Sequence, residues 1–369
     1  MNASTFSAAD TALMRVALEL AATAKRRASP NPAVGCVIVV DGEIVGRGAT
    51  EAPGSRHAEI VALDEAGPRA AGSHVYVSLE PCAHFGRTPP CVDALIAAQV
   101  AAVTIAVTDP DERTHGAGAE TLRAAGITVR IGLLADEATA LNAGFFMRCT
   151  AGRPRVTAKV AASLDGVVAM DSGESQWITG PAARQRGHEL RAASDALITG
   201  IGTVLADDPR LSARGADGTA LTTQPLRVVV DSQSRLPATA QLFSESGSVL
   251  QVTTSLTDNP TPAELEVVAA TKTGRIDLAD LLQRLGRRDI NDALLEAGPT
   301  LTGAFAAAGL IDELRWFVAP VLLGSVTRKA LETPSWLRLA DGQRLDIQGL
   351  ETVGDDLLIS ASFAPARYN

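Results

Sequence analysis

Residues 57–59, His-Ala-Glu, and residues 81–91, Pro-Cys-Ala-His-Phe-Gly-Arg-Thr-Pro-Pro-Cys, contain one imidazole and two thiols that suit a zinc ion. A catalytic zinc keeps three protein ligands and leaves the fourth position to water, whereas a structural zinc takes all four ligands from protein. Zinc lowers the pKa of bound water toward neutrality and so generates a nucleophile. His57, Cys82 and Cys91 are the candidate ligands. Glu59 is the candidate residue that carries protons to the leaving group.

His-x-Glu followed by Pro-Cys-x-x-Cys is the signature of the zinc deaminases. Here eight residues separate the two cysteines, so the intervening chain must loop out and return. His84 and Arg87 in this insert are suited to an anionic substrate. The stretch resembles the deaminase half of the bifunctional riboflavin-biosynthesis deaminase/reductase family, whose motif Pro-Cys-x-His-x-Gly-Arg-Thr-Pro-Pro-Cys it reproduces residue for residue.

Other roles for the cysteines need comparison. Cys82 and Cys91 could form a disulfide, but four cysteines in 369 residues without an apparent signal peptide disfavour an oxidised framework. A closed structural zinc site could recruit Cys36, although its place in the apolar run 34–40 favours a small core residue. Cys149 has no partner motif, and we expect it to be inert.

Composition limits the class of protein. A chain of 369 residues that is 46% hydrophobic suits two or three soluble domains, and no apolar run has the length of a membrane span. The polar start lacks a basic segment of the secretory type, which predicts the cytoplasm. The net charge of −9 disfavours binding to nucleic acid, which needs a basic surface.

The first half alternates helical and extended patterns. Residues 7–27 predict an amphipathic helix with Ser7 as N-cap, and residues 34–48 predict a hairpin turning at Asp41-Gly42. A helix is expected from His57 to Ala66, and a second helix is expected to start at Pro81-Cys82. Strands are predicted at 75–79, 103–107 and 128–131, and a helix at 136–148. This alternation predicts a largely parallel sheet covered on both faces.

A Gly/Pro-containing link at 150–154 marks the predicted boundary between domains 1–149 and 150–369. Beyond it, strands are predicted at 155–162, 195–199, 227–231 and 293–296. Two of these lead through glycine into a helix, at Gly200-Ile201-Gly202-Thr203 and at Gly298-Pro299-Thr300. A helix N-terminus favours phosphate, but such turns are also common as structure, and neither matches Gly-x-Gly-x-x-Gly.

The second half resembles the reductase half of the same family. The segments that carry this resemblance are 158–166, 172–179, 203–211, 231–232 and 296–300. The resemblance implies a cytidine-deaminase-like three-layer α/β/α domain, a dihydrofolate-reductase-like α/β domain, one zinc ion per chain, NADPH as a cofactor, and a homo-oligomer. Departures from the family pattern stand at Arg56, Asp111 and Ala117.

The resemblance also implies individual contacts. In the first domain, Asn31 in Pro-Asn-Pro, together with His84 and Arg87, would contact the substrate, although Asn31 also fits a plain turn residue. The NADPH contacts would be Ala161, Trp177, Thr203, Asp207, Ser232, Gly298, Pro299, Thr300, Leu301, Thr302, Gly303 and Ala304. The substrate contacts of the second domain would be Lys159, Ser175, Arg191, Leu211, Arg214 and Glu296.

Two of these residues have alternatives: Asp207, expected to stabilise a cationic imine, also fits a helix end, and Trp177 also fits a core residue. Arg191 and Arg214 suit phosphate because a guanidinium donates in a planar fork.

The expected activity is two-step. The first domain would deaminate 2,5-diamino-6-ribosylamino-4(3H)-pyrimidinone 5′-phosphate, and the second would reduce the ribosyl group to ribityl with NADPH. One rival is a zinc deaminase of free nucleosides or tRNA with an accessory domain, which the long cysteine spacing and the acidic charge oppose. A second rival is a binding protein that retains the ribotide pocket without reduction.

Overall fold

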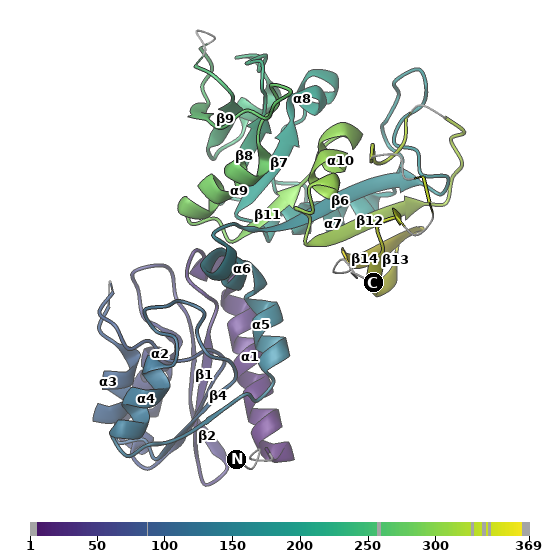
Figure 1. The fold of residues 1–369 in the computed structure, drawn as a ribbon. Coiled ribbons are helices and arrows are strands. Elements are labelled where there is room, and N and C mark those ends of the chain that lie inside the picture. The colour runs from purple at the N-terminus through teal and green to yellow at the C-terminus, as the bar shows by residue number, and fades with distance from the viewer. Residues whose placement is uncertain are drawn as a thin grey trace. The chain divides into compact units, whose positions relative to one another are not determined.

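The chain folds as two compact units, residues 1–152 and 153–369, each built around its own sheet (Figure 1). The structure is a computed structural model that describes residues 6–86, 88–256, 260–325, 328–333, 337–338 and 341–363. Arg87, one of the predicted substrate contacts, lies outside the described residues.

Helix α1 (Ala8–Ala28) begins at a capping box, as Ser7 predicted. The Ser7 hydroxyl oxygen accepts a hydrogen bond from Asp10 N–H at 3.0 Å, and the Asp10 carboxylate accepts one from Ser7 N–H at 2.9 Å. Met14, Ala17 and Leu18 of this helix pack on one face of the first sheet, where Ala138 of α5 (Ala135–Leu141) joins them.

The first sheet has the strand order β2-β1-β3-β4-β5. Its members are β1 (Gly35–Val40), β2 (Glu43–Ala49), β3 (His74–Val77), β4 (Ala102–Ile105) and β5 (Thr128–Ile131). The predicted hairpin forms, since β1 pairs antiparallel with β2. Strand β3 is antiparallel to β1 and parallel to β4, and β4 is parallel to β5. The parallel part thus begins only at β3.

Helices α2 (Ala58–Ala66), α3 (Cys91–Ala97) and α4 (Ala117–Ala124) cover the second face, with the short helix η1 (Gly67–Ala70) after α2 and Phe145 of α6 (Ala143–Ala151) beside them. The unit therefore has three layers. Gly48 lets α2 approach β2 closely, because a Cβ there would lie 1.9 Å from the carbonyl oxygen of Ala58. This contact fixes the beginning of α2, where His57 is the N-cap.

Two predicted helices differ from the structure. The helix predicted at 136–148 is divided at Asn142 into α5 and α6. The second helix was expected to start at Pro81-Cys82, but α3 begins at Cys91 with Pro90 as its N-cap. The described residues of the insert between the two cysteines, 83–86 and 88–90, are irregular and include Gly86, Pro89 and Pro90. Proline lacks an N–H and restricts the residue before it, so this insert cannot continue a helix. Cys91, rather than Cys82, is therefore the cysteine at a helix N-terminus.

The second unit contains a nine-stranded sheet with the order β10-β9-β8-β7-β11-β6-β12-β14-β13. Pairing is parallel from β10 to β12 and antiparallel for the last two pairs. The strands are β6 (Arg155–Ser163), β7 (Ala196–Gly200), β8 (Leu226–Val230), β9 (Val249–Thr253), β10 (Glu264–Val267), β11 (Asp292–Leu295), β12 (Glu313–Ala319), β13 (Leu345–Val353) and β14 (Asp356–Phe363).

Helices cover both faces of this sheet. Side chains of α9 (Leu278–Arg287) and α10 (Pro299–Ala307) belong to the large core on one face. Helix α7 (Pro181–Ala192), helix α8 (Ile201–Asp207) and the short helix η2 (Gln241–Ser244) contribute to smaller clusters. Both units are thus mixed α/β, as predicted. In the described part of the chain, helices fall short of the length and apolarity that a membrane crossing needs.

Candidate active sites

His57, Cys82 and Cys91 come together in the first unit, with ligand atoms all within 4.8 Å of one another. His57 precedes α2, Cys82 lies in the segment after β3, and Cys91 begins α3. The Nδ1 atom of His57 lies 3.2 Å from the Cys91 sulfur and 3.6 Å from the Cys82 sulfur. One nitrogen and two sulfur donors suit tetrahedral zinc, and three protein ligands leave a position for water. Cys36 is buried in β1 and is not a member of this cluster.

The hydrogen bond between the two cysteines shifts their pKa values in opposite directions. Cys91 donates to Cys82, and this hydrogen bond is the main reason that the pKa of Cys82 falls to about 4. The same hydrogen bond and burial raise the pKa of Cys91. A metal ion binds the thiolate form of cysteine, so it would displace this remaining proton. Cys82 is therefore already in the thiolate form that binds a cation, whereas Cys91 must still lose its proton.

Glu59 lies in the first turn of α2 and is only 3% exposed. Burial, with the negative charge of Cys82, raises the pKa of Glu59 to about 7. A carboxyl group with such a pKa can both accept and donate a proton near neutral pH. This buried acid beside an open ligand set is the arrangement that hydrolytic deamination requires.

Hydrogen bonds join the chain around Cys82 to the segment 109–119. His84 Nδ1 lies 3.0 Å from the hydroxyl oxygen of Thr114, which is fully buried. Glu80 accepts hydrogen bonds from the N–H groups of Asp109, Gly116 and Ala119 at 3.2, 3.0 and 3.0 Å. Sequence reasoning missed this role of Glu80, although an acid directly before Pro81-Cys82 was a visible signal.

Asn31 lies in the turn between α1 and β1, where its N–H donates to the carbonyl oxygen of Ala28 at 2.8 Å. The neighbouring residue Ala33 exchanges two hydrogen bonds with the buried side chain of Asn142, at 2.8 and 2.9 Å. The backbone of this turn is therefore fixed in place.

In the second unit, Glu296 is the centre of a charged cluster. Its carboxylate accepts from Arg191 at 2.7 and 2.8 Å and from Lys159 at 3.3 Å. Burial alone would raise the pKa of Glu296, but the two cations outweigh burial and hold it well below its ordinary value. The predicted substrate residues Lys159, Arg191 and Glu296 thus meet, although they come from β6, α7 and the end of β11.

His188 is a further member of this region that sequence reasoning missed. Its Nδ1 atom lies 3.2 Å from the carbonyl oxygen of Ser212, to which Arg191 also donates at 3.1 Å. Burial and the nearby Arg191 lower the pKa of His188. The available signal was its spacing, because His188 stands three residues before Arg191 on one helix face.

The two glycine-containing turns lie side by side. Gly298 is the N-cap of α10, and its N–H donates to the hydroxyl oxygen of Thr203 in α8 at 3.1 Å. Strands β7 and β11, which lead into these turns, are neighbours in the sheet. Two helix N-termini therefore face one region, and N-termini favour phosphate groups.

The remaining predicted residues of this unit occupy varied settings. Trp177 is 70% exposed, so it is not the core residue of the alternative reading, and the guanidinium carbon of Arg184 lies 4.8 Å from its ring centroid. Leu211 is buried against Leu197 and Leu294. Asp207 is the exposed last residue of α8. Ala161 lies in β6, Ser175 is half-buried, Ser232 follows β8, and Arg214 pairs with Glu245.

Comparison with known proteins covers both units. Residues 7–107 match the family described as the cytidine and deoxycytidylate deaminase zinc-binding region, and residues 154–359 match the RibD C-terminal domain. The riboflavin biosynthesis protein RibD of Escherichia coli K12 is 44% identical over 356 residues, covering 94% of this chain and 97% of that protein. The RibD protein of Haemophilus influenzae is 43% identical over 365 residues, covering 96% and 98%. The chain belongs to the RibD family.

Solved RibD structures agree with the whole fold. Acinetobacter baumannii RibD, form 1, has a TM-score of 0.88 at 40% identity, covering 97% of this chain and 99% of that chain. The diaminohydroxyphosphoribosylaminopyrimidine deaminase/5-amino-6-(5-phosphoribosylamino)uracil reductase of Thermotoga maritima has a TM-score of 0.86 at 30% identity, covering 96% and 99%. Like RibD, the protein is a bifunctional deaminase and reductase of riboflavin biosynthesis, with zinc and NADPH as its cofactors.

Proposed function

We propose that residues 1–149 deaminate 2,5-diamino-6-ribosylamino-4(3H)-pyrimidinone 5′-phosphate and that residues 150–369 then reduce the ribosyl group to give 5-amino-6-(5-phospho-ribitylamino)uracil. The observation that carries the proposal is the cluster of His57, Cys82 and Cys91 beside the buried Glu59, in a chain that matches RibD over both units. The division of the fold near residue 152 supports assigning one reaction to each unit.

In the first unit, His57, Cys82 and Cys91 hold the zinc ion, which supplies an activated water when bound. Glu59 takes the proton from the nucleophile and gives it to the departing amine, a transfer for which a pKa of about 7 is well suited. Asn31, His84 and Arg87 orient the ribotide. The hydrogen bond between His84 and Thr114 supports the role of His84, because it fixes the imidazole on the loop that follows Cys82.

In the second unit, NADPH supplies the hydride, and the protein orients the two partners. Thr203, Ser232 and Gly298 hold the nucleotide, with Ala161, Trp177 and the remaining α10 residues Pro299, Thr300, Leu301, Thr302, Gly303 and Ala304. Lys159, Ser175, Arg191, Leu211, Arg214 and Glu296 hold the ribotide. Asp207 stabilises the positive charge of the imine that accepts hydride. The ionised Glu296 supports this arrangement, because it keeps two cations in place for an anionic substrate.

The deciding experiment gives the enzyme the diaminopyrimidinone ribotide and NADPH and follows ammonia release and NADPH oxidation together. We expect both reactions, and we expect zinc chelation to stop both while reduction of pre-deaminated ribotide continues. Ammonia release without NADPH oxidation would refute the reductase assignment. Turnover of cytidine or tRNA instead of the ribotide would refute the substrate.

A homo-oligomer is the second part of this proposal. Strand β13 is one of the two edges of the nine-stranded sheet, and its Ile347 and Leu350 are 69% and 66% exposed. An apolar exposed edge favours pairing with another chain, and a second copy offers the same edge. We expect light scattering to give a mass above that of one chain, and Ile347→Asp to lower it. A monomeric wild type would contradict the proposal.

The cytoplasm is the proposed location. Cys82 and Cys91 must stay reduced to bind zinc, and thiols persist in the reducing cytoplasm. Cell fractionation that follows the NADPH-dependent activity tests this location, and recovery of that activity outside the cytoplasmic fraction would contradict it.

A further inference from the structure

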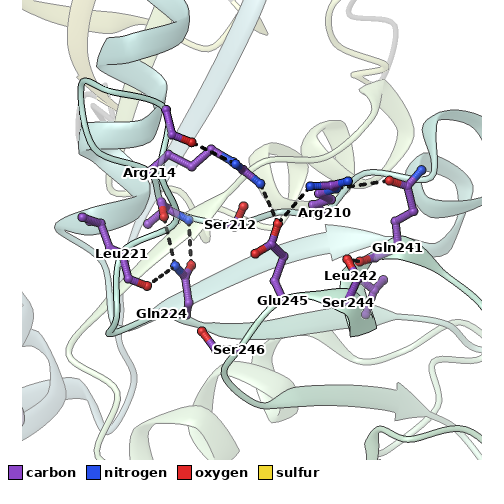
Figure 2. A network of polar contacts seen from close by, with 12 residues as sticks. Arg210, Ser212, Arg214, Leu221, Gln224, Gln241, Leu242, Ser244, Glu245 and Ser246 are labelled. Atoms are coloured by element: carbon purple, nitrogen blue, oxygen red, sulfur yellow. Dashed lines mark hydrogen bonds and ion pairs between the residues drawn. The ribbon is translucent and has the colours of Figure 1, made fainter.

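The carboxylate of Glu245 lies between two arginines of the second unit, as Figure 2 shows. Its Oε1 atom is 2.5 Å from Nη2 of Arg214 and 3.4 Å from Nη1 of Arg210. The side chains of Glu245 and Arg214 are 13% and 24% exposed, whereas Arg210 is 55% exposed. Glu245 is thus the most buried of the three side chains. The sequence analysis did not assign Glu245 to the ribotide site.

Arg214 stands on a small hairpin that is closed at its base. Its Nη1 atom donates to the carbonyl oxygen of Gly218 within the hairpin at 2.9 Å. The amide of Gln224 fastens the base by accepting from Ala213 N–H at 2.7 Å and by donating to the carbonyl oxygens of Ala213 and Leu221 at 2.9 and 2.7 Å (Figure 2). The backbone that carries Arg214 is therefore held independently of Glu245.

Glu245 stands on a segment that is held by Arg227, a fully buried residue of β8. Arg227 donates to the carbonyl oxygens of Leu242, Ser246 and Gly247 at 2.7, 2.7 and 2.6 Å. A fourth donation, to the carbonyl oxygen of Glu245 itself, is 3.3 Å long. Burying a guanidinium is costly unless its donors are satisfied. Here Nη1 and Nη2 bond to the backbone of residues 242–247, whereas the buried Nε has no hydrogen-bond partner among the described residues.

The two supports are packed against each other at Gly247. Its φ angle is +93°, and a Cβ there would lie 2.9 Å from Cβ of Gln224 and 3.3 Å from Nη2 of Arg227. Gln224 and Arg227 both belong to the chain around β8. Hence the backbone segments that carry Arg214 and Glu245 are both held by the chain around β8. The ion pair therefore joins two side chains whose backbone positions are fixed.

The charge balance of this group leaves it attractive to an anion. One carboxylate faces the two cations Arg210 and Arg214, and Arg227 lies behind it. Glu245 therefore orients the guanidinium of Arg214 without cancelling the local positive charge. A guanidinium that is already oriented loses less entropy when it binds a phosphate.

We propose that Glu245 is a positioning residue of the reductase site, which holds Arg214 for the 5′-phosphate of the ribotide and is itself fixed by Arg227. This inference rests on the proposed function, in which Arg214 contacts the ribotide. Glu245 touches neither the reacting carbon nor the nicotinamide in this role. Its loss should therefore weaken binding of the phosphorylated substrate without slowing the chemical step.

The test compares Glu245→Ala, Glu245→Gln and Arg214→Gln with the wild type in the full-length enzyme. KM and kcat are measured for NADPH-dependent reduction of the pre-deaminated ribotide and of the same compound without its phosphate. For Glu245→Ala we expect the KM for the ribotide to rise roughly tenfold, which equals about 1.4 kcal/mol, with kcat retained. The dephosphorylated compound should be reduced as by the wild type. Glu245→Gln, which keeps an acceptor oxygen, should restore part of the KM.

Glu264→Ala is the matched control, because Glu264 is an exposed acid of the same unit that also pairs with an arginine, Arg288. It should change neither KM. The double variant Glu245→Ala with Arg214→Gln should bind the ribotide no more weakly than Arg214→Gln alone, since coupled residues are not additive.

The outcomes separate the inference from the proposal beneath it. An unchanged ribotide KM in Arg214→Gln would overturn the proposed role of Arg214, and the inference with it. A raised KM in Arg214→Gln with an unchanged or lowered KM in Glu245→Ala would overturn only the inference. An equal loss of kcat for both substrates in Glu245→Ala would show a merely structural residue and would also overturn it.

Discussion

The Cys91 sulfur lies 3.2 Å from Nδ1 of His57, although 34 positions separate the two residues in the chain. Each stands where a helix starts, His57 as the N-cap of α2 and Cys91 as the first residue of α3. These two helices cover the same face of the first sheet. Their starting points bring the imidazole and the thiol together, and the loop after β3 adds Cys82.

Glu59→Gln should abolish proton transfer while leaving the metal site intact. We expect ammonia release to fall by roughly 10²–10⁴-fold, the usual contribution of a general acid–base group. Zinc content and reduction of pre-deaminated ribotide should stay at the wild-type level. Glu65→Gln, an exposed acid on the same helix, is the control. Full deaminase activity in Glu59→Gln would exclude the assigned role.

Cys82→Ala should empty the zinc site, because two remaining ligands hold zinc poorly. Metal analysis of the purified protein should give less than one zinc per chain, and deamination should be lost while reduction continues. Cys149→Ala, which removes a half-buried thiol outside the cluster, should keep both zinc and activity. Zinc at one per chain in Cys82→Ala would mean that the ligand set has been identified wrongly.

Asp10→Asn should destabilise the first unit in a pH-dependent way. Burial alone would raise the pKa of Asp10, but hydrogen bonds from Tyr76, Arg130 and Ser7 outweigh burial and hold it well below its ordinary value. The carboxylate therefore stabilises the fold fully above about pH 4, its unfolded pKa. The stabilisation fades as pH falls toward the folded pKa. At pH 7 the substitution should cost about 2 kcal/mol, typical of hydrogen bonds to charged groups.

The measurement for Asp10 is the difference in unfolding temperature between Asp10→Asn and the wild type from pH 7 to pH 3. We expect the difference to shrink below pH 4. Asp64→Asn, which removes an exposed carboxylate paired with Arg56, should change stability little at either pH. A difference for Asp10→Asn that stays constant over this range would contradict the assignment.

Gly303→Ala should destabilise the second unit by about 1–3 kcal/mol, the usual cost of overpacking. A Cβ at Gly303 in α10 would lie 2.1 Å from the carbonyl oxygen of Glu332, and backbone cannot give way as a flexible side chain can. Gly202→Ala in α8 is the matched control, because a Cβ there meets nothing within 4 Å. Denaturant unfolding of both variants checks the prediction. An equal free energy of unfolding for Gly303→Ala and Gly202→Ala would mean that the close approach of Gly303 to Glu332 does not affect stability.

Helix and strand prediction from sequence succeeded where patterns were long or marked by caps. The capping box at Ser7 located α1, and the Asp41-Gly42 turn located the hairpin of β1 and β2. It failed at Cys82, where the proline-containing insert displaced the helix to Cys91. Strands β9, β10, β12, β13 and β14 were not predicted. Strand β13 is exposed along most of its length and lacks the continuous apolar run that would have indicated it.

The sequence by itself determined the zinc ligand set and the expectation of two catalytic halves, because residue types at short spacing carry that chemistry. Tertiary structure alone decided the ion pairs. Glu296 meets Arg191 across 105 positions, and Glu245 meets Arg214 across 31. Such pairs depend on the order of the strands in the sheet and on which loops lie next to each other. The periodicity of residues along one segment gives no information about either. Local chemistry is therefore readable from the chain, whereas the orientation of charged groups is set by the sheet that carries them.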